Sequence, residues 1–218
     1  LIAIPYSYQH PVEVVESNII GTLNVLQAAR STGVERLVHT SSSEVYGTAL
    51  KVPIGEDHPL QGQSPYSASK IGADKLAESY FRAYGLPVVT LRPFNTYGPR
   101  QSTRAVIPAI ITQALTSDVV RIGNLEARRD LTYVSDTVLG FVKVAETEGV
   151  AGETFNLGTG QEVSIAELAR EIFALMGKTP TLEVEPARLR PEESEVHRLL
   201  SDNRYAREML DWSPRVSL

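Results

Sequence analysis

Apolar residues along this chain recur at spacings typical of helices and of buried strands. Between residues 11 and 30 they recur every three or four positions, which predicts an amphipathic helix that ends at Gly33. A second helix is predicted to begin after Ser64, a side-chain N-cap followed by proline, and to end at Gly85. The remaining helices are predicted at residues 105–115, in a stretch ending near Gly149, at residues 165–176 and just before Trp212.

Three short runs rich in β-branched and apolar residues predict buried strands at residues 36–42, 87–93 and 153–157. The first two flank the helix that begins after Ser64. Strand, helix and strand in this order are typical of a parallel βαβ unit with a right-handed crossover. The predicted fold class is therefore α/β, with a Rossmann-like parallel sheet.

Composition narrows the possible partners and compartments. The chain has 218 residues, 42% of them hydrophobic, and a net charge of −5, which argues against a nucleic-acid or anionic-membrane surface. No apolar run approaches the roughly 20 residues of a membrane span, and the opening residues do not resemble a signal peptide. The absence of cysteine excludes a thiolate nucleophile and favours a cytoplasmic location. The four histidines show no metal-ligand spacing, so no metal site is predicted.

Tyr66 and Lys70 share one face of the second predicted helix, because they are four residues apart. A free phenol has a pKa of about 10 and is a poor base near neutral pH. An ammonium about 4 Å away would stabilise the phenolate by at most roughly 4 kcal/mol at an effective dielectric of about 20. We therefore expect Lys70 to lower the pKa of Tyr66 and make it a proton acceptor.

Polar residues follow two of the predicted strands directly. Ser42, Ser43 and Glu44 come after the first strand, and Asn95 comes two residues after Pro93, the last residue of the second. The carboxyl ends of parallel strands meet at one edge of a sheet, where ligands bind. The sequence thus predicts that these residues gather at one site.

Seven motifs in order along the chain resemble the extended short-chain dehydrogenase/reductases, in particular the NAD-dependent epimerase/dehydratase family. The resemblance implies NAD as a recycled cofactor, a nucleotide-diphosphate sugar as the substrate, and a homodimer formed through the helices that contain Asn18 and Tyr66. The motifs are SSSEVYG, YSASK, RPFNTYGPRQ, RRDLTYVSD, FNLGTG, LRPEESEV and LDWSP.

The resemblance also implies roles for single residues. Tyr66 would be the base at the sugar C4 hydroxyl, with Lys70 as its electrostatic partner and Ser42 hydrogen-bonded to the same sugar oxygen. Glu44 would remove the C5 proton. The cofactor-binding residues would be Tyr66, Lys70 and Pro93, and the substrate-binding residues would be Ser43, Asn95, Arg129 and Arg190.

Glu44 favours a 4,6-dehydratase among the reactions of this family. The resembling epimerases tend to have a small apolar residue there, whereas decarboxylases also keep a glutamate. Ser43 stands where dehydratases of deoxythymidine-linked glucose have aspartic acid, although the GDP-mannose type has serine. The closest resemblance is to dehydratases of nucleotide-linked N-acetylglucosamine. A 4-epimerase and a decarboxylase remain alternatives.

The family's glycine-rich GxxGxxG turn does not occur in this sequence. The family pattern places residues 1–100 in the C-terminal part of the dinucleotide-binding domain, and residues 101–218 mainly in a substrate-binding region, with 130–160 returning to the sheet. We therefore expect an N-terminal part to be missing, an open strand edge at residues 36–42, and no activity from this fragment alone. The alternative from another class is a catalytically silent sugar-nucleotide-binding or assembly module.

Overall fold

Three parallel strands form the central sheet, in the order β1, β2, β7. They are β1 (Leu37–Thr40), β2 (Val88–Pro93) and β7 (Thr154–Leu157), so all three predicted strands are present. The structure is a computed structural model that describes residues 1, 2 and 4–218. Within these residues β1 pairs only with β2, and a groove of about 360 Å³ runs along its other side, against α3. The strand edge predicted to be open is therefore open.

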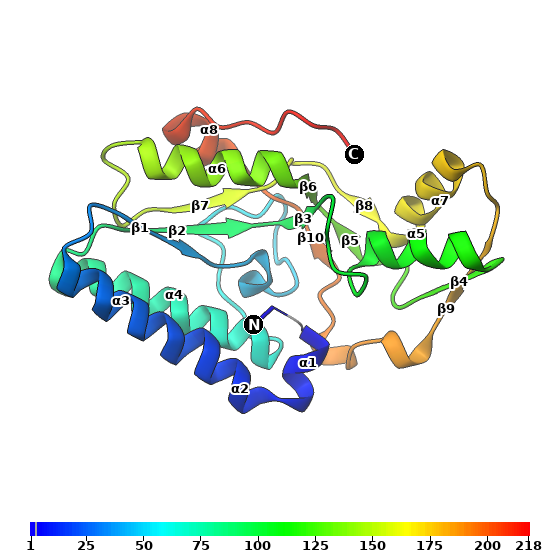
Figure 1. The fold of residues 1–218 in the computed structure, drawn as a ribbon, viewed down its shortest axis with the longest axis horizontal. Coiled ribbons are helices and arrows are strands. Elements are labelled where there is room, and N and C mark those ends of the chain that lie inside the picture. Colours follow the sequence, from blue (N-terminus) through cyan, green and yellow to red (C-terminus); the bar gives the residue numbers. More distant parts are fainter. Residues whose placement is uncertain (3) are drawn as a thin grey trace.

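Helices cover both faces of this sheet (Figure 1). On one face lie α3 and α4, and on the other lie α6 and α8. Their bounds are α3 (Gly21–Thr32), α4 (Pro65–Tyr84), α6 (Val134–Glu146) and α8 (Arg204–Leu210). This three-layer arrangement is the α/β architecture that the sequence predicted.

The predicted helix at residues 11–30 is continuous, but its middle turn is π-helical rather than α-helical. It consists of α2 (Pro11–Val15), a π-helical turn (Glu16–Ile20) and α3, and is preceded by α1 (Ile4–Gln9). The π-helical turn contains Asn18, a buried residue whose Nδ2 donates to Ser69 Oγ on α4 at 2.9 Å. The extra residue of such a turn redirects side chains, and here it accompanies a polar contact between two neighbouring helices.

Both ends of α4 follow from local chemistry. Ser64 Oγ accepts a hydrogen bond from the Ser67 amide at 3.0 Å, and Ser67 Oγ accepts one from the Ser64 amide at 2.9 Å. This reciprocal capping satisfies two amides that a helix start leaves without partners. Gly85 ends the helix in the left-handed conformation, with φ of +65°. The helix therefore begins and ends where the sequence predicted.

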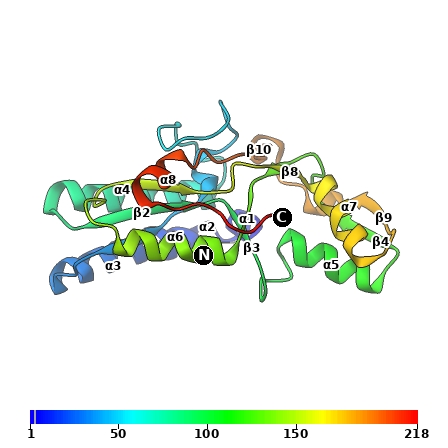
Figure 2. The same cartoon turned by 90° about the horizontal axis from the view of Figure 1, so that it is seen from above.

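A second lobe packs around α5 (Val106–Thr116) and α7 (Ile165–Met176), with β4 (Val119–Ile122) paired in parallel with β9 (Thr181–Val184). Seen from above in Figure 2, this lobe lies at the end of the molecule away from α3. Both helices were predicted, whereas the β4–β9 pair was not. The lobe has its own core, which includes Ile110, Val120, Leu168 and Phe173.

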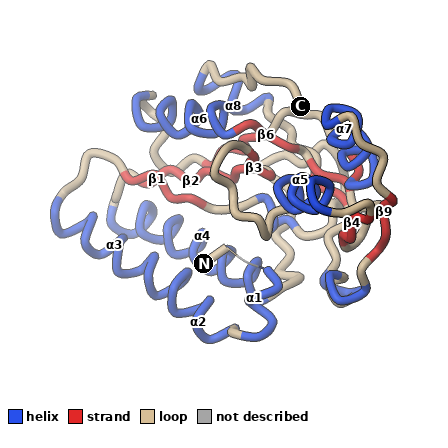
Figure 3. The backbone as a smooth tube through the Cα atoms, turned by 45° about the vertical axis from the view of Figure 1, so that its right-hand side comes forward, coloured by secondary structure: helices blue, strands red, loops and turns tan. Residues whose placement is uncertain are grey.

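Short strand pairs join the lobe to the central sheet, and they appear as separate red segments in Figure 3. The strand β3 (Asn95–Tyr97) pairs with β6 (Leu131–Tyr133), directly beyond the end of β2. Three further segments pair in the order β10–β5–β8. Their bounds are β5 (Arg128–Arg129), β8 (Val163–Ser164) and β10 (Arg198–Leu199). None of these pairings was predicted, because runs of two or three residues carry no periodicity.

No helix in residues 1–2 and 4–218 combines the length and the apolar character that crossing a bilayer requires.

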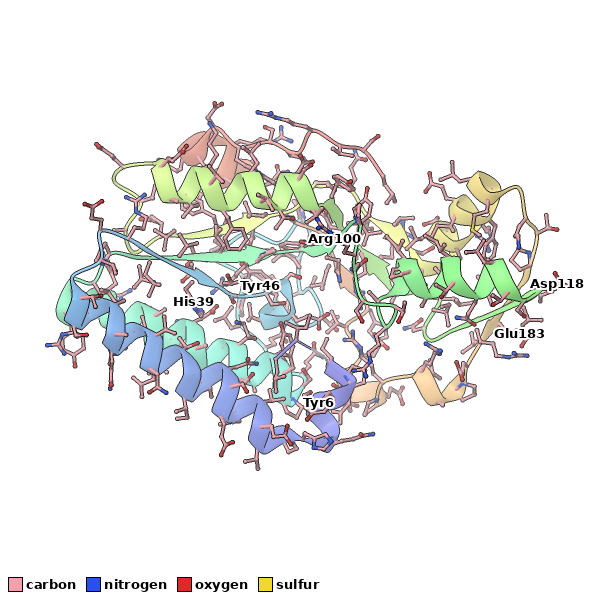
Figure 4. The ribbon with its side chains drawn as sticks, in the orientation of Figure 1. Tyr6, His39, Tyr46, Arg100, Asp118 and Glu183 are labelled. Atoms are coloured by element: carbon pink, nitrogen blue, oxygen red, sulfur yellow. The ribbon has the colours of Figure 1, made fainter. Side chains whose placement is uncertain are left out.

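A buried carboxylate on α4 ties this helix to two strands of the sheet. Asp74 Oδ1 lies 3.0 Å from His39 Nε2, and Oδ2 accepts from Ser41 Oγ at 2.8 Å and from Arg92 Nε at 3.2 Å. Arg92 Nη1 also donates to the Tyr46 hydroxyl at 2.9 Å. In Figure 4, His39 lies between the sheet and the helices beneath it.

Burial would raise the pKa of Asp74, but the hydrogen bond from His39 and the Arg92 cation outweigh it, so the pKa is lowered. The ionised carboxylate is therefore the form that the fold selects. This contribution to stability is present above the pKa of an unfolded aspartate, about 3.9, and is lost as the pH falls through the lower folded-state value.

We expect Asp74→Asn to lower the free energy of unfolding by about 3 kcal/mol at pH 7, because it leaves the buried Arg92 cation without a counter-ion. Urea unfolding of the purified protein measures this, and the difference from wild type should narrow below about pH 4. The matched control is Asp57→Asn, an exposed carboxylate paired with Lys51, which should change the stability little. Equal effects of the two variants would contradict the role given to Asp74.

Candidate active site

The end of β1 is shaped by Ser42. Its backbone is extended, and its Oγ accepts from the Glu44 amide at 3.2 Å, which caps a 3-10 turn over Ser43–Tyr46. The turn buries both Ser43 and Glu44, with 3% and 8% of their surface exposed. One serine thus fixes its own hydroxyl and the neighbouring glutamate at the carboxyl edge of the sheet.

Tyr66 reaches the same place from the first turn of α4. Its ring is buried, and its hydroxyl lies near the Ser42 side chain. Burial raises the pKa of Tyr66, the Ser42 hydroxyl opposes this, and the negative charges of Glu44 and Asp74 raise the pKa further. The structure therefore brings Ser42, Glu44 and Tyr66 together, as the sequence predicted.

Lys70 lies one turn further along α4 but is engaged elsewhere. Its Nζ donates to the Thr40 carbonyl of β1 at 2.6 Å. Burial lowers the pKa of Lys70, and Asp74 opposes this. The prediction that Lys70 lowers the pKa of Tyr66 is wrong for this structure, because the phenol is buried beside two carboxylates. The group that favours the phenolate here is Ser42.

A cavity of about 460 Å³ opens between the two lobes beside this strand edge. Asn95, Arg129 and Arg190, three of the residues predicted to bind substrate, all line it. Ser43, the fourth, does not line this cavity but is buried in the turn after β1. Pro93 is the last residue of β2. The cavity also has two arginines that the sequence analysis missed, because isolated surface arginines carry no signal; these are Arg104 and Arg188.

Arg129 is a buried cation with a weak counter-ion. Only 6% of its surface is exposed. Within the described residues its carboxylate partner is Glu195, whose Oε1 lies 3.8 Å from Nη2, too far for a hydrogen bond. Burial lowers the pKa of Arg129, which the charge of Glu44 opposes. A guanidinium held in this way is suited to an anionic ligand.

Asn95 adds a second unsatisfied group. Its Oδ1 is buried and has no hydrogen-bond partner in the part of the chain that the structure describes. Buried polar atoms are rarely left without partners in proteins. A ligand that carries both anionic oxygens and hydroxyl groups would satisfy Asn95 and Arg129 together.

Asp130, the residue after Arg129, binds backbone amides rather than the neighbouring arginine. Its carboxylate accepts from the amides of Thr159 at 2.8 Å, Gly160 at 2.9 Å and Ser201 at 3.2 Å. It does not form the ion pair with Arg129 that their adjacency in sequence allows. Instead it fixes the turn after β7 and leaves Arg129 for the cavity.

One ion pair joins the cavity to the strand edge. Arg190 Nη1 lies 3.3 Å from Glu44 Oε2, and both side chains are largely buried. The two residues are 146 positions apart in sequence. Neither this ion pair nor the position of Glu195 beside Arg129 could be predicted from the sequence, since no pattern of spacing connects such distant segments.

Comparison with known proteins places this arrangement in a family. The family model described as GDP-mannose 4,6 dehydratase matches residues 1–218. Among curated proteins, the chain is 37% identical to a UDP-glucose 4-epimerase of Mycolicibacterium smegmatis, over 92% of this chain and 64% of the relative. It is also 34% identical to UDP-glucuronic acid decarboxylase 1 of Arabidopsis thaliana, over 99% of this chain and 50% of that relative.

Among solved structures, the chain resembles DesIV, a dTDP-glucose 4,6-dehydratase from Streptomyces venezuelae crystallised with NAD. The TM-score is 0.88 and the identity 31%, over 99% of this chain and 66% of DesIV. The chain thus spans between half and two thirds of each of these relatives. The Rossmann-like fold class and the resemblance drawn from the ordered motifs are both confirmed. The chain belongs to the GDP-mannose 4,6-dehydratase family of extended short-chain dehydrogenase/reductases, together with nucleotide-sugar dehydratases, epimerases and decarboxylases.

Proposed function

We propose that the protein is an NAD-dependent nucleotide-sugar 4,6-dehydratase, which oxidises C4, eliminates water across C5 and C6, and reduces C6. The observation that carries this proposal is the position of Glu44. It lies close enough to Tyr66 to raise the phenol pKa, and it contacts Arg190 of the cavity. A carboxylate between a C4 base and a phosphate-binding cavity is suited to removing the C5 proton.

The residues present fit the part of the NAD site that this chain supplies. Lys70 Nζ has three donors, and the bond to Thr40 leaves capacity for ribose hydroxyls. Pro93 ends β2 at the carboxyl edge, where dinucleotides bind in such sheets. Tyr66, Lys70 and Pro93 would therefore hold the cofactor. When bound, NAD accepts the C4 hydride and later returns it to C6.

The chain's own residues move the protons. Tyr66 accepts the proton of the C4 hydroxyl, and Ser42, whose hydroxyl lies near the Tyr66 phenol, binds the same sugar oxygen. Once C4 is a ketone, the C5 proton becomes acidic and Glu44 removes it, and the C6 hydroxyl leaves as water with a proton passed on from Glu44. As C6 is reduced, C5 takes up one proton from the solvent, which balances the proton that Tyr66 accepted.

The second lobe and its connecting strands hold the substrate. Residues 101–218 supply Arg129 and Arg190, whose guanidiniums bind the diphosphate, and Asn95 contributes from β3. Residues 1–100 carry the proton-transfer groups, and 130–160 return to the sheet through β7. Ser43 contacts the sugar from the turn after β1.

We also propose a cytoplasmic homodimer formed through the helices that contain Asn18 and Tyr66. Its support is a row of exposed apolar side chains along α2 and α3 and the turn between them, since such clusters mark interaction surfaces. These are Val12, Val15, Ile20 and Val25, with 68%, 41%, 47% and 54% of their surface exposed.

Tyr66→Phe in the complete protein should lower turnover by about 10²- to 10⁴-fold, the usual contribution of a general base. Nucleotide-sugar binding should stay within a few-fold of wild type, because the hydroxyl acts in the chemical step. Steady-state kinetics and calorimetric titration measure the two quantities. Tyr84→Phe, an exposed tyrosine at the other end of α4, is the control. Near-normal turnover in Tyr66→Phe would exclude this base, and a wild type without turnover would favour the silent binding module.

Glu44→Gln should stop elimination while still allowing oxidation at C4, so that reduced cofactor accumulates and can be followed by its absorbance. In deuterated water the wild-type product should carry deuterium at C5. Glu192→Gln, an exposed carboxylate near Arg190 in sequence, should behave as wild type. A C4-inverted product without C5 deuterium would instead identify a 4-epimerase, and release of carbon dioxide from a uronic acid a decarboxylase.

Residues 1–218 expressed alone should be inactive and should bind NAD about a thousand-fold more weakly than a complete relative, equivalent to about 4 kcal/mol. The reason is that the sequence lacks the glycine turn whose helix N-terminus receives the pyrophosphate. Calorimetric titration with NAD tests this. Micromolar binding with measurable dehydration would overturn it.

A further inference from the structure

Four charged side chains meet where the cavity joins the strand edge. Glu44 pairs with Arg190 at 3.3 Å, and Glu195 lies 3.8 Å from Arg129. The two arginines and Glu44 also act on one another electrostatically. We call these residues the charge quartet. Its formal charges cancel, so a diphosphate entering the cavity would unbalance it.

The two arginines are held differently within the quartet. Arg129 is almost fully buried, and its Nη1 is fixed by the carbonyl of Arg128 at 2.9 Å. Arg190 has 21% of its side chain exposed, and within the described residues its hydrogen bond is the single one to Glu44. A guanidinium has five N–H donors in a planar fork, which suits two phosphate oxygens better than one carboxylate oxygen at 3.3 Å. Arg190 is therefore the member of the quartet that a diphosphate can recruit.

We propose that Arg190 couples diphosphate binding to the release of Glu44 as a base. In the free protein Arg190 pairs with Glu44. A diphosphate in the cavity takes over this guanidinium, and Glu44 loses its ion-pair partner beside the bound sugar. Arg190 is thus a positioning residue for Glu44 as well as a diphosphate ligand. This inference rests on the proposed function.

The coupling has a measurable proton signature. The charged and titratable groups that face Glu44 are Arg190, Arg129 and the Tyr66 phenol. Losing the Arg190 cation and gaining a nearby anion both increase the affinity of a carboxylate for protons. Binding must then take up protons, and by linkage the affinity for the ligand must rise as the pH falls.

The experiment is calorimetric titration of the complete protein with UDP-N-acetylglucosamine, dTDP-glucose and GDP-mannose, without added NAD, between pH 5 and 7. Each titration is run in two buffers of different ionisation enthalpy, which gives the number of protons taken up. These sugar nucleotides have no phosphate group that titrates in this range. For the ligand that binds best, we expect uptake of about half a proton and an affinity gain of about threefold per pH unit.

Variants assign the proton to Glu44. Glu44→Gln should bind the ligand without proton uptake. Arg190→Gln should bind more weakly, by about tenfold, and should also lose the uptake, because Glu44 then has no ion pair with residue 190 to lose. Arg190→Lys, which keeps the charge, should restore part of the uptake. Glu193→Gln, an exposed neighbour, should keep both affinity and uptake.

The outcomes separate the coupling from the proposed function. Tight binding by the wild type without proton uptake would overturn the coupling and leave the dehydratase proposal intact, and this result needs no variant to fold. Uptake that persists in Glu44→Gln or in Arg190→Gln would also overturn it. If none of the three sugar nucleotides binds, the cavity is not a diphosphate site, and the proposed function and the coupling fail together.

Discussion

The candidate active site depends on one buried carboxylate, Asp74. It accepts hydrogen bonds from Ser41, which directly follows β1, and from Arg92 of β2, and it pairs with His39 of β1. Tyr66, Lys70 and Asp74 follow one another at intervals of four residues on α4, so fixing Asp74 fixes the face that carries the other two. These polar contacts thereby help to set the register between helix and sheet, because a fully satisfied buried network is rigid and specific.

This constraint has an electrostatic consequence for the site. The same Asp74 that positions α4 raises the pKa of Tyr66 and opposes the lowering of the pKa of Lys70. The free protein thus holds its phenol protonated. The fold brings Ser42, Glu44 and Tyr66 together, and burial and carboxylates raise the pKa of the phenol in the free protein. Under the proposed function, activation of the phenol comes with the ligands.

The second lobe contributes cations where the first contributes carboxylates. Asp130 lies between β5 and β6 and anchors the turn after β7, which holds the neighbouring Arg129 in place. Burying a guanidinium is costly unless an anion accompanies it. Glu195 is too distant to hydrogen-bond to it, so donors of this guanidinium remain available for an anionic ligand of the kind proposed.

The sequence by itself determined the parts of this protein that depend on neighbours along the chain. Helical periodicity, the Ser64 cap and the stops at Gly33 and Gly85 are local, so the main helices and the three strands of the central sheet were predicted. Ser42 and Glu44 were also predicted to lie at the carboxyl edge of the sheet, because they directly follow a parallel strand. That Tyr66 joins them was implied by the family resemblance. Tertiary structure alone decided that Glu44 pairs with Arg190, that Glu195 faces Arg129, and that Lys70 binds Thr40. Those contacts depend on burial and on segments far apart in the chain, for which no spacing rule exists.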